Sequence, residues 1–125
     1  MRGRLLSATL CLFLTGCEEA LEPRFCTAIA VDALTVTVAD AASGQRVCDA
    51  TVTAVDGAFS AELREFALGP DCSYSGPTER PGRYEVRVTR AGYEAAVRSG
   101  VNVTADECHV IPVLVTVNLI RNPAP

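Results

Sequence analysis

Residues 34–40 read Leu34-Thr35-Val36-Thr37-Val38-Ala39-Asp40. From Leu34 to Val38, every second side chain is aliphatic and the residues between are threonines. Successive side chains of a strand point to opposite faces, so this alternation predicts a β-strand with the aliphatic residues inside and the threonines outside. The same period recurs in residues 50–54, 59–63, 84–88 and 109–119, and no window shows a convincing helical period. The pattern predicts an all-β chain, an antiparallel β-sandwich of about seven strands.

Several stretches interrupt the alternation. The apolar phase shifts after Ile29 and Val31, which predicts a β-bulge or a strand that changes sheets. Residues 67–82 hold three Gly/Pro pairs and are predicted to be the longest irregular loop, our candidate contact surface. A weak strand is expected over about residues 94–98 and a short one over 101–103. Pro112 lacks an N–H group, so the last strand should lie at a sheet edge or bulge there.

The N-terminus has the layout of a secretory signal. Arg2 and Arg4 precede an apolar run over residues 5–14, which is too short to span a bilayer. Leu14-Thr15-Gly16-Cys17 then resembles the lipobox of bacterial lipoproteins. The resemblance implies that residues 1–16 are a removed signal peptide and that the Cys17 thiol carries a diacyl (palmitate-type) anchor. Residues 17–25 are then a short tether and residues 26–125 the β-sandwich domain. The alternative is a plain secretory signal with Cys17 as a disulfide partner.

Four cysteines remain once Cys11 leaves with the signal and Cys17 carries lipid. An even number of cysteines in a small exported domain predicts two disulfides. Of three connectivities we favour Cys48–Cys72, which closes a local loop, and Cys26–Cys108, which joins the start of the first strand to the start of the last. A zinc site is the rival, but the chain has no C-x-x-C pair and one histidine, so no metal is expected.

Two sequence elements occur in the order found in a known family. The first is Val36-x-Val38-x-Asp40-x-x-Ser43-Gly44, continued by Val47-Cys48-Asp49-Ala50-x-Val52; the second is Pro81-Gly82-x-Tyr84-x-Val86-x-Val88, followed by Ala91-Gly92-Tyr93. Together they resemble carboxypeptidase regulatory-like domains, over roughly residues 33–119. The resemblance implies an Ig-like or prealbumin-like sandwich that is an accessory or structural module without catalytic residues. The cysteines and the insertion at residues 67–82 depart from the family pattern.

Few residues suggest chemistry. His109 is the only histidine, and no motif places a nucleophile beside it; we interpret it as a structural histidine of the last strand. Finding it beside carboxylates in a pocket would favour a small envelope enzyme instead. The pairs Glu62/Glu65 and Asp106/Glu107 lack a calcium-loop pattern and are interpreted as solvated carboxylates. Five arginines gather within residues 80–98, and we expect them to form a charged outer face rather than an anion site.

These observations predict a lipid-anchored, non-catalytic β-sandwich lipoprotein of the cell envelope that acts as a binding or structural module. An inhibitor or stress-response factor acting on an exported hydrolase is the alternative. The net charge of −4, or −6 without Arg2 and Arg4, argues against nucleic acid and anionic lipid. We expect a monomer, no cofactor, membrane contact through the anchor only, and an envelope protein as candidate partner. Glu18 and Glu19 after Cys17 favour the outer membrane of a two-membrane bacterium, or otherwise the outer face of the cell membrane.

Overall fold

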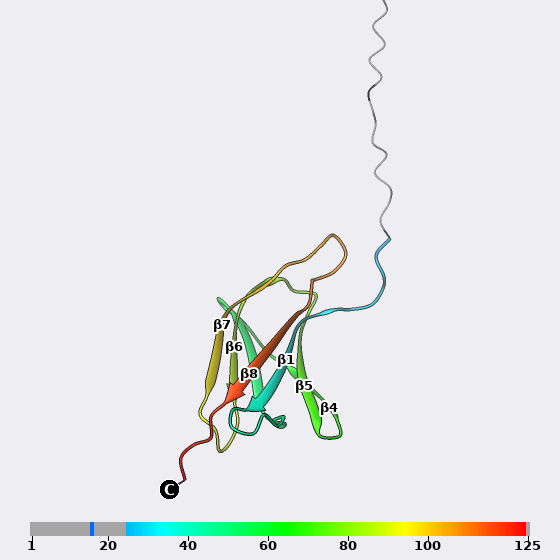
Figure 1. Cartoon of the computed structure of the whole chain (residues 1–125). Helices are drawn as coiled ribbons and strands as arrows, with labels where there is room; N and C mark the ends of the chain where they lie inside the picture. Colours follow the sequence, from blue (N-terminus) through cyan, green and yellow to red (C-terminus); the bar gives the residue numbers. More distant parts are fainter. Residues whose placement is uncertain (1–15, 17–24, 125) are drawn as a thin grey trace, which may run out of the picture.

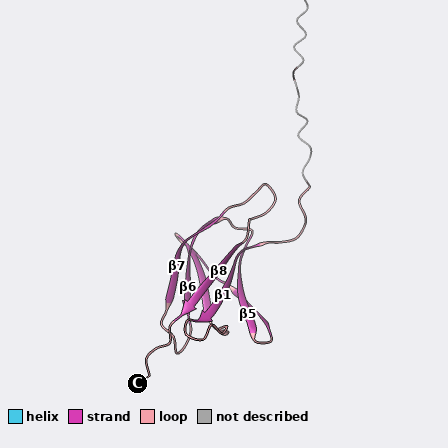
Figure 2. Cartoon of the chain, viewed as in Figure 1, coloured by secondary structure: helices cyan, strands magenta, loops and turns pink. Residues whose placement is uncertain are grey.

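Eight strands make up the described part of the chain, and they form two facing four-stranded sheets (Figures 1 and 2). The computed structural model describes Gly16 and residues 25–124. The strands are β1 (Asp32–Asp40), β2 (Thr51–Asp56), β3 (Phe59–Glu62), β4 (Arg64–Leu68), β5 (Asp71–Thr78), β6 (Gly82–Thr89), β7 (Ala96–Val103) and β8 (Val113–Leu119). Within the described residues, no helix has the length and apolarity needed to cross a membrane.

Sheet A has the strand order β4-β5-β1-β8, and sheet B has the order β3-β2-β6-β7. All neighbouring strands are antiparallel except β1 and β8, which run parallel with Leu34 opposite Val113 and Asp40 opposite Leu119. A parallel neighbour requires a crossover rather than a hairpin. The chain supplies it by leaving sheet B after β7 and re-entering sheet A beside β1. The all-β sandwich is therefore confirmed, with this parallel pair as a departure from the expected antiparallel sheets.

The core is the aliphatic layer between the sheets. Its members come from the predicted alternating positions, including Leu34, Val36 and Val38 on β1 and Val86 and Val88 on β6, all fully buried. Tyr74 and Tyr84 bury their rings, and each hydroxyl reaches a backbone carbonyl, of Val47 at 3.1 Å and of Arg80 at 2.6 Å. The hydroxyl of a buried tyrosine usually has such a partner, which offsets the cost of removing it from water.

The sandwich has two ends, and each holds several of the connections between strands. The upper end in Figure 1 holds residues 25–31, the β5–β6 connection (79–81) and the β7–β8 connection (104–112). The lower end holds residues 41–50, the β4–β5 turn, the β6–β7 connection and the segment after β8. A disulfide lies at each end, Cys26–Cys108 at the upper and Cys48–Cys72 at the lower. Both are the pairs expected from the sequence.

The predicted loop over residues 67–82 is wrong. It consists of the end of β4, a two-residue turn at Gly69-Pro70, all of β5 and a short connection to β6. Along β5, Cys72, Tyr74 and Gly76 are buried while the residues between them are more exposed, so the strand period is present. Two of the three inward positions are a disulfide cysteine and a glycine, so the sequence shows no alternation of aliphatic residues there. The Gly and Pro residues of this segment are typical of turns and led to the prediction of a loop.

Three smaller expectations also change. No strand includes Ile29, which is 69% exposed, because residues 25–31 precede β1 instead of pairing in a sheet. The two weak strands expected at 94–98 and 101–103 are one strand, β7, whose pairing with β6 is shifted between Tyr84 and Val86. His109 lies in the connection before β8 rather than in the last strand, and Pro112 directly precedes that edge strand.

Candidate functional site

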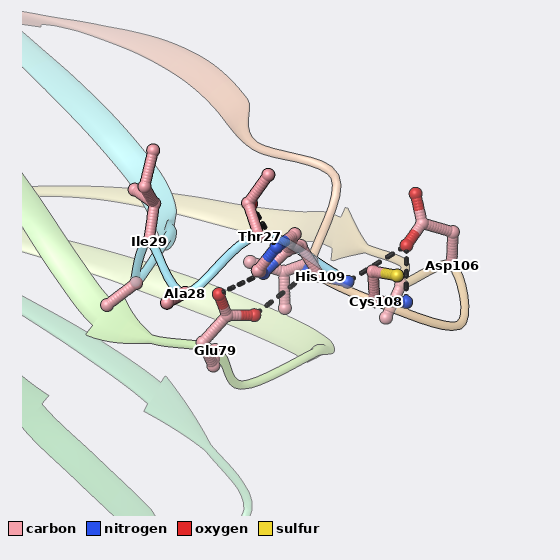
Figure 3. Close-up of a pocket in the computed structure, with 10 residues that line it drawn as sticks. Thr27, Ala28, Ile29, Glu79, Asp106, Cys108 and His109 are labelled. Atoms are coloured by element: carbon pink, nitrogen blue, oxygen red, sulfur yellow. Dashed lines mark hydrogen bonds and ion pairs between the residues drawn. The ribbon is translucent and has the colours of Figure 1, made fainter. Parts of the chain in front are cut away.

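Three segments that are distant in sequence meet around an open hollow of about 460 Å³ at the upper end (Figure 3). Residues 27–30 form one wall, Glu79 stands opposite, and the β7–β8 connection contributes residues 105, 106 and 108–110. The hollow contains the chain's one histidine beside a carboxylate and a hydroxyl. This is the arrangement that the sequence left open as the sign of a site with chemistry.

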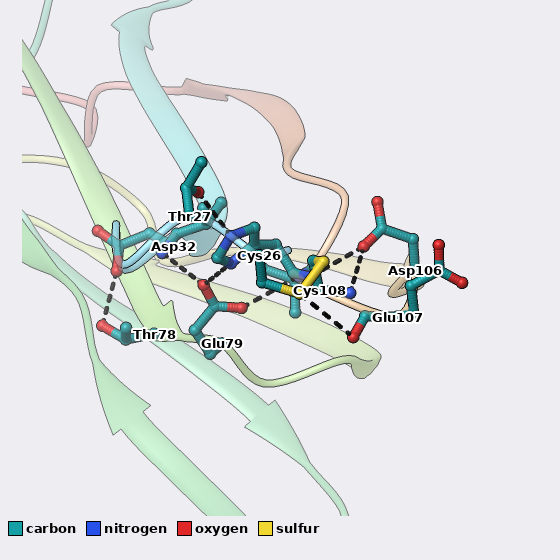
Figure 4. Close-up of polar contacts among 11 residues, drawn as sticks. Cys26, Thr27, Asp32, Thr78, Glu79, Asp106, Glu107 and Cys108 are labelled. Atoms are coloured by element: carbon teal, nitrogen blue, oxygen red, sulfur yellow. Dashed lines mark hydrogen bonds and ion pairs between the residues drawn. A yellow bond between two sulfur atoms is a disulfide. The ribbon is translucent and has the colours of Figure 1, made fainter. Parts of the chain in front are cut away.

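Glu79 is the centre of this cluster (Figure 4). Its Oε1 accepts the backbone N–H of Val31 at 2.8 Å, and its Oε2 accepts that of Val110 at 3.1 Å. The backbone N–H of Glu79 donates in return to the carbonyl of Val31 at 2.8 Å. Glu79 adopts a positive φ of 49°, which is unfavourable for a residue with a Cβ, so these contacts hold it in a strained conformation.

His109 joins Glu79 to Thr27. Its Nδ1 lies 2.7 Å from Glu79 Oε1, and its Nε2 lies 2.9 Å from Thr27 Oγ1. A carboxylate only accepts hydrogen bonds, so Nδ1 carries a proton. In the neutral imidazole, Nε2 is then the acceptor for the Thr27 hydroxyl. The side chains of His109 and Glu79 are 21% and 33% exposed, so the pair is reachable from solvent.

The charge of Glu79 is favoured by its surroundings. Burial alone would raise the pKa of Glu79, but hydrogen bonds from His109, Val31 and Val110 outweigh it and bring the pKa below its ordinary value. The carboxylate therefore stays ionised through the neutral and mildly acidic range. It acts as a fixed acceptor for two backbone segments and one imidazole.

A covalent bond closes the same site. Cys26 is joined to Cys108, with their Cα atoms 5.2 Å apart. The turn that presents Cys108 and His109 is held by Asp106, whose Oδ1 accepts both of their backbone N–H groups at 2.8 and 2.9 Å. Residues 25–31 are thus fastened to the body by a disulfide, by Thr27 and by Val31. Asp106, predicted to be solvated, has this structural role, whereas Thr27 and Glu79 were missed.

A signal for part of this site was present in the sequence. Thr27 follows Cys26 and His109 follows Cys108, so the predicted disulfide already places the hydroxyl near the imidazole. Glu79 had no such signal, because it belonged to the segment interpreted as a loop.

A second carboxylate organises the lower end. Asp40 Oδ1 accepts the backbone N–H groups of Ala42 and Ser43, both at 2.9 Å, and so forms the β1–β2 turn. Its Oδ2 accepts the Tyr93 hydroxyl at 2.8 Å and Arg121 Nε at 2.6 Å. Asp40 and Tyr93 belong to the two separate sequence elements that carried the family resemblance. The fold brings them into direct contact.

The remaining candidates do not gather into a site. Glu62 is exposed on β3, while Glu65 Oε1 accepts the backbone N–H of Asp49. Glu65 also lies near the Cys48 and Cys72 sulfurs, but these are bonded to each other and are not free thiolate ligands. The arginines between residues 80 and 98 are engaged separately. Arg80 pairs with Asp56 and covers the Phe59 ring, and Arg87 pairs with Glu85.

The chain was also compared with known proteins. No protein-family model matches it, and no curated protein sequence matches it. The lipobox falls outside the described residues except for Gly16, so Cys17 and the predicted cleavage site have no structural counterpart here. The upper-end hollow with Thr27, His109 and Glu79 is the best-defined candidate site in the described chain.

Proposed function

We propose that the protein is a lipid-anchored, non-catalytic module of the bacterial cell envelope, in which one β-sandwich acts as a binding or structural unit. The lipobox supports the anchor, and two disulfides support export to an oxidising compartment. Two or three acyl chains on Cys17 hold a domain of this size stably on a membrane. The outer membrane of a two-membrane bacterium, or otherwise the outer face of the cell membrane, is the proposed location.

One observation carries this proposal furthest: the segment that follows the tether is fastened to the sandwich at three points. These are the Cys26–Cys108 bond, the Thr27–His109 contact and the two hydrogen bonds that the Val31 backbone makes with Glu79, one with its carboxylate and one with its backbone N–H. Where a chain links a lipid to a folded domain, the first residues of the domain must be fixed firmly to the rest of it. The eight residues from Glu18 to Phe25 span at most about 28 Å when extended. The upper end is therefore held within this distance of the anchor.

A carboxypeptidase regulatory-like sandwich is the proposed type of domain. The contact between Asp40 and Tyr93 supports it, because it explains why both sequence elements are needed together. Positive φ angles at Gly44 and Gly92, 74° and 86°, explain the glycine in each element. The contact surface expected at residues 67–82 consists mainly of strands rather than a loop. An inhibitor or stress-response factor acting on an exported hydrolase is the alternative function.

Mass spectrometry of the mature N-terminus tests the anchor directly. The expected species begins at Cys17 and carries the mass of two or three acyl chains, and it fractionates with membranes until detergent is added. Cys17→Ser should release the protein into the soluble fraction, whereas Cys11→Ser should leave the mature mass unchanged. A mature chain that begins elsewhere, or an unmodified Cys17, would overturn the proposal.

A second function is favoured by the order Thr27 hydroxyl, His109 imidazole, Glu79 carboxylate. With the distances of 2.9 and 2.7 Å, His109 Nε2 is placed to take the hydroxyl proton while Glu79 orients the ring. Hydrolysis of p-nitrophenyl acetate by the purified protein would test this function. Activity that is retained by Thr27→Ser and lost in Thr27→Val would establish it. Equal rates for the wild type and Thr27→Val would exclude it.

A further inference from the structure

Strand β4 is an uncovered edge of sheet A (Figure 1). It pairs with β5 on one side only, and all five of its residues are exposed. Two of them are large and apolar, Phe66 at 60% and Leu68 at 68% exposure. An edge with these properties is a ready template for another strand.

The hairpin geometry determines which backbone groups of β4 are free. Leu68 and Asp71 flank the two-residue turn, so they exchange both backbone hydrogen bonds. Pairs alternate from there, so Phe66 and Arg64 also direct their N–H and C=O groups toward β5. The N–H and C=O groups of Glu65 and Ala67 therefore point outward from the sheet. They offer two donors and two acceptors to an incoming strand.

The other three edges of the described sandwich differ. On β8, Arg98 of β7 donates from Nη1 to the carbonyl of Thr116 at 3.3 Å, which uses part of that edge and joins it to β7. On the opposite side, β3 has only four residues and continues through the buried Leu63 into β4. The same contact uses part of β7, and β7 and β8 each carry one large exposed apolar side chain, Val97 and Leu114. Strand β4 is the described edge that carries two, Phe66 and Leu68.

We propose that two copies of this protein pair through β4, antiparallel and about a two-fold axis that passes beside Phe66. In this register Glu65 exchanges both backbone hydrogen bonds with Ala67 of the second copy, and Arg64 lies opposite Leu68 of the second copy. The two Phe66 rings meet on the outer face, since residues of a non-hydrogen-bonded pair lie closest. All five residues are used, and no like charges are directly opposed. Centring the axis on Glu65 would oppose two carboxylates.

This pairing departs from the monomer expected from the sequence, and its strength depends on the anchor. One pair of five-residue strands buries less surface than the about 800 Å² per partner of a stable complex. Contact in dilute solution is therefore weak. The two-fold axis points the upper ends of the two copies in opposite directions, so both anchors reach one membrane when the strands lie along its surface. Confinement in this orientation raises the effective concentration of the second copy, which turns a weak contact into a populated dimer. In this respect the inference rests on the proposed function.

Cysteine cross-linking of the full-length protein tests the register. Phe66→Cys places two thiols across the axis, and Leu114→Cys is the matched control, because Leu114 is 80% exposed on the outer face of the same sheet at its other edge. In membranes under mild oxidation, Phe66→Cys should form disulfide dimers at least about tenfold faster than Leu114→Cys. Equal rates would overturn the pairing.

Two further variants test whether the cross-linking of Phe66→Cys depends on the outward N–H group of Ala67. Ala67→Pro removes one outward N–H without affecting the bonds to β5, so in the Phe66→Cys background it should reduce cross-linking to the control rate. Ala67→Ser keeps this N–H group and should leave the cross-linking rate of Phe66→Cys unchanged. If the mature protein carries lipid and Phe66→Cys fails to cross-link, the pairing is wrong and the anchor stands. If it carries no lipid, Phe66→Cys in a concentrated Cys17→Ser chain decides the pairing alone, with cross-linking above the Leu114→Cys rate supporting it.

Discussion

Among the described residues, Asp40 is the only buried charged side chain. The hydrogen bond from Arg121, followed by those from Ser43 and Tyr93, holds the pKa of Asp40 well below its usual range. A lowered pKa means that the charge stabilises the fold above the ordinary pKa of about 4, and that this contribution is lost as the pH falls through the lowered value.

We therefore expect Asp40→Asn to lower the melting temperature by several degrees at pH 7, because an amide cannot accept from Arg121 and Tyr93 as a carboxylate does. The difference from the wild type should narrow as the pH falls below about 4. Thermal unfolding followed by circular dichroism across a pH series measures both effects. Asp71→Asn, an exposed change, is the control. Parallel curves for Asp40→Asn and the wild type at all pH values would contradict the expectation.

Glu79 has the corresponding role at the upper end. In Glu79→Gln an NH₂ group faces a backbone N–H that the carboxylate now accepts, so we expect a lower melting temperature at pH 7. The lowered pKa of Glu79 stabilises the fold above the ordinary glutamate pKa and ceases to do so as the pH falls through the lowered value. The variant should lack this pH dependence. Glu62→Gln, exposed on β3, should melt as the wild type does.

Single residues were predictable where the chemistry was local or covalent. The number of cysteines predicts two disulfides, and their positions favoured the observed pairs among three connectivities. Glu79 could not be identified as a hub. Besides His109, the partners of its carboxylate are the backbone N–H groups of Val31 and Val110, 48 and 31 residues away, and a backbone donor leaves no mark on the sequence.

For whole elements, predictability depended on how many inward positions carry aliphatic side chains. Strands β1, β2 and β6 have valine, alanine or leucine at most of these positions, and all three were predicted. Strand β5 faces the core with a cysteine, a tyrosine and a glycine and was mistaken for a loop. Strand β7 was divided because its first half is exposed and Gly100, at a φ of 71°, interrupts its pattern. The parallel direction of β8 has no local signal.

Gly82, the first residue of β6, lies close to the side chain of Asp56, the last residue of β2. A Cβ on Gly82 would lie 2.5 Å from Asp56 Oδ2 and 3.0 Å from Arg80 Nη1, the two groups of one ion pair. We expect Gly82→Ala to destabilise the fold by about 0.5–1 kcal/mol, because the added methyl group displaces the ends of two partly exposed side chains and disturbs their ion pair. Chemical denaturation in a double-mutant cycle with Asp56→Ala checks the cause, because removing the carboxylate should relieve most of this cost. An unchanged cost in that background would show another origin.

At the scale of the whole molecule, each end combines a disulfide with a carboxylate hub. Cys26–Cys108 and Glu79 hold the upper end, and Cys48–Cys72 and Asp40 hold the lower end. The sheets between them need neither device, since their valine-rich core is continuous. The ends are thus stabilised separately, and only the upper one lies on the path from the proposed anchor to the body.

Removing the two disulfides one at a time should therefore give different results. The bridges span 82 and 24 residues, so the loop-entropy model gives losses of about 4.5 and about 3.5 kcal/mol. Replacing Cys26 and Cys108 with serine should also speed hydrogen exchange at the amides of Val31 and Val110, which donate to Glu79. The amides of Ala42 and Ser43 should be unaffected. Replacing Cys48 and Cys72 should instead expose the Ala50 amide, which donates to the Tyr74 hydroxyl. Uniform acceleration in both variants would mean that the two ends unfold together, and that the upper end is no separate fastening for a tether.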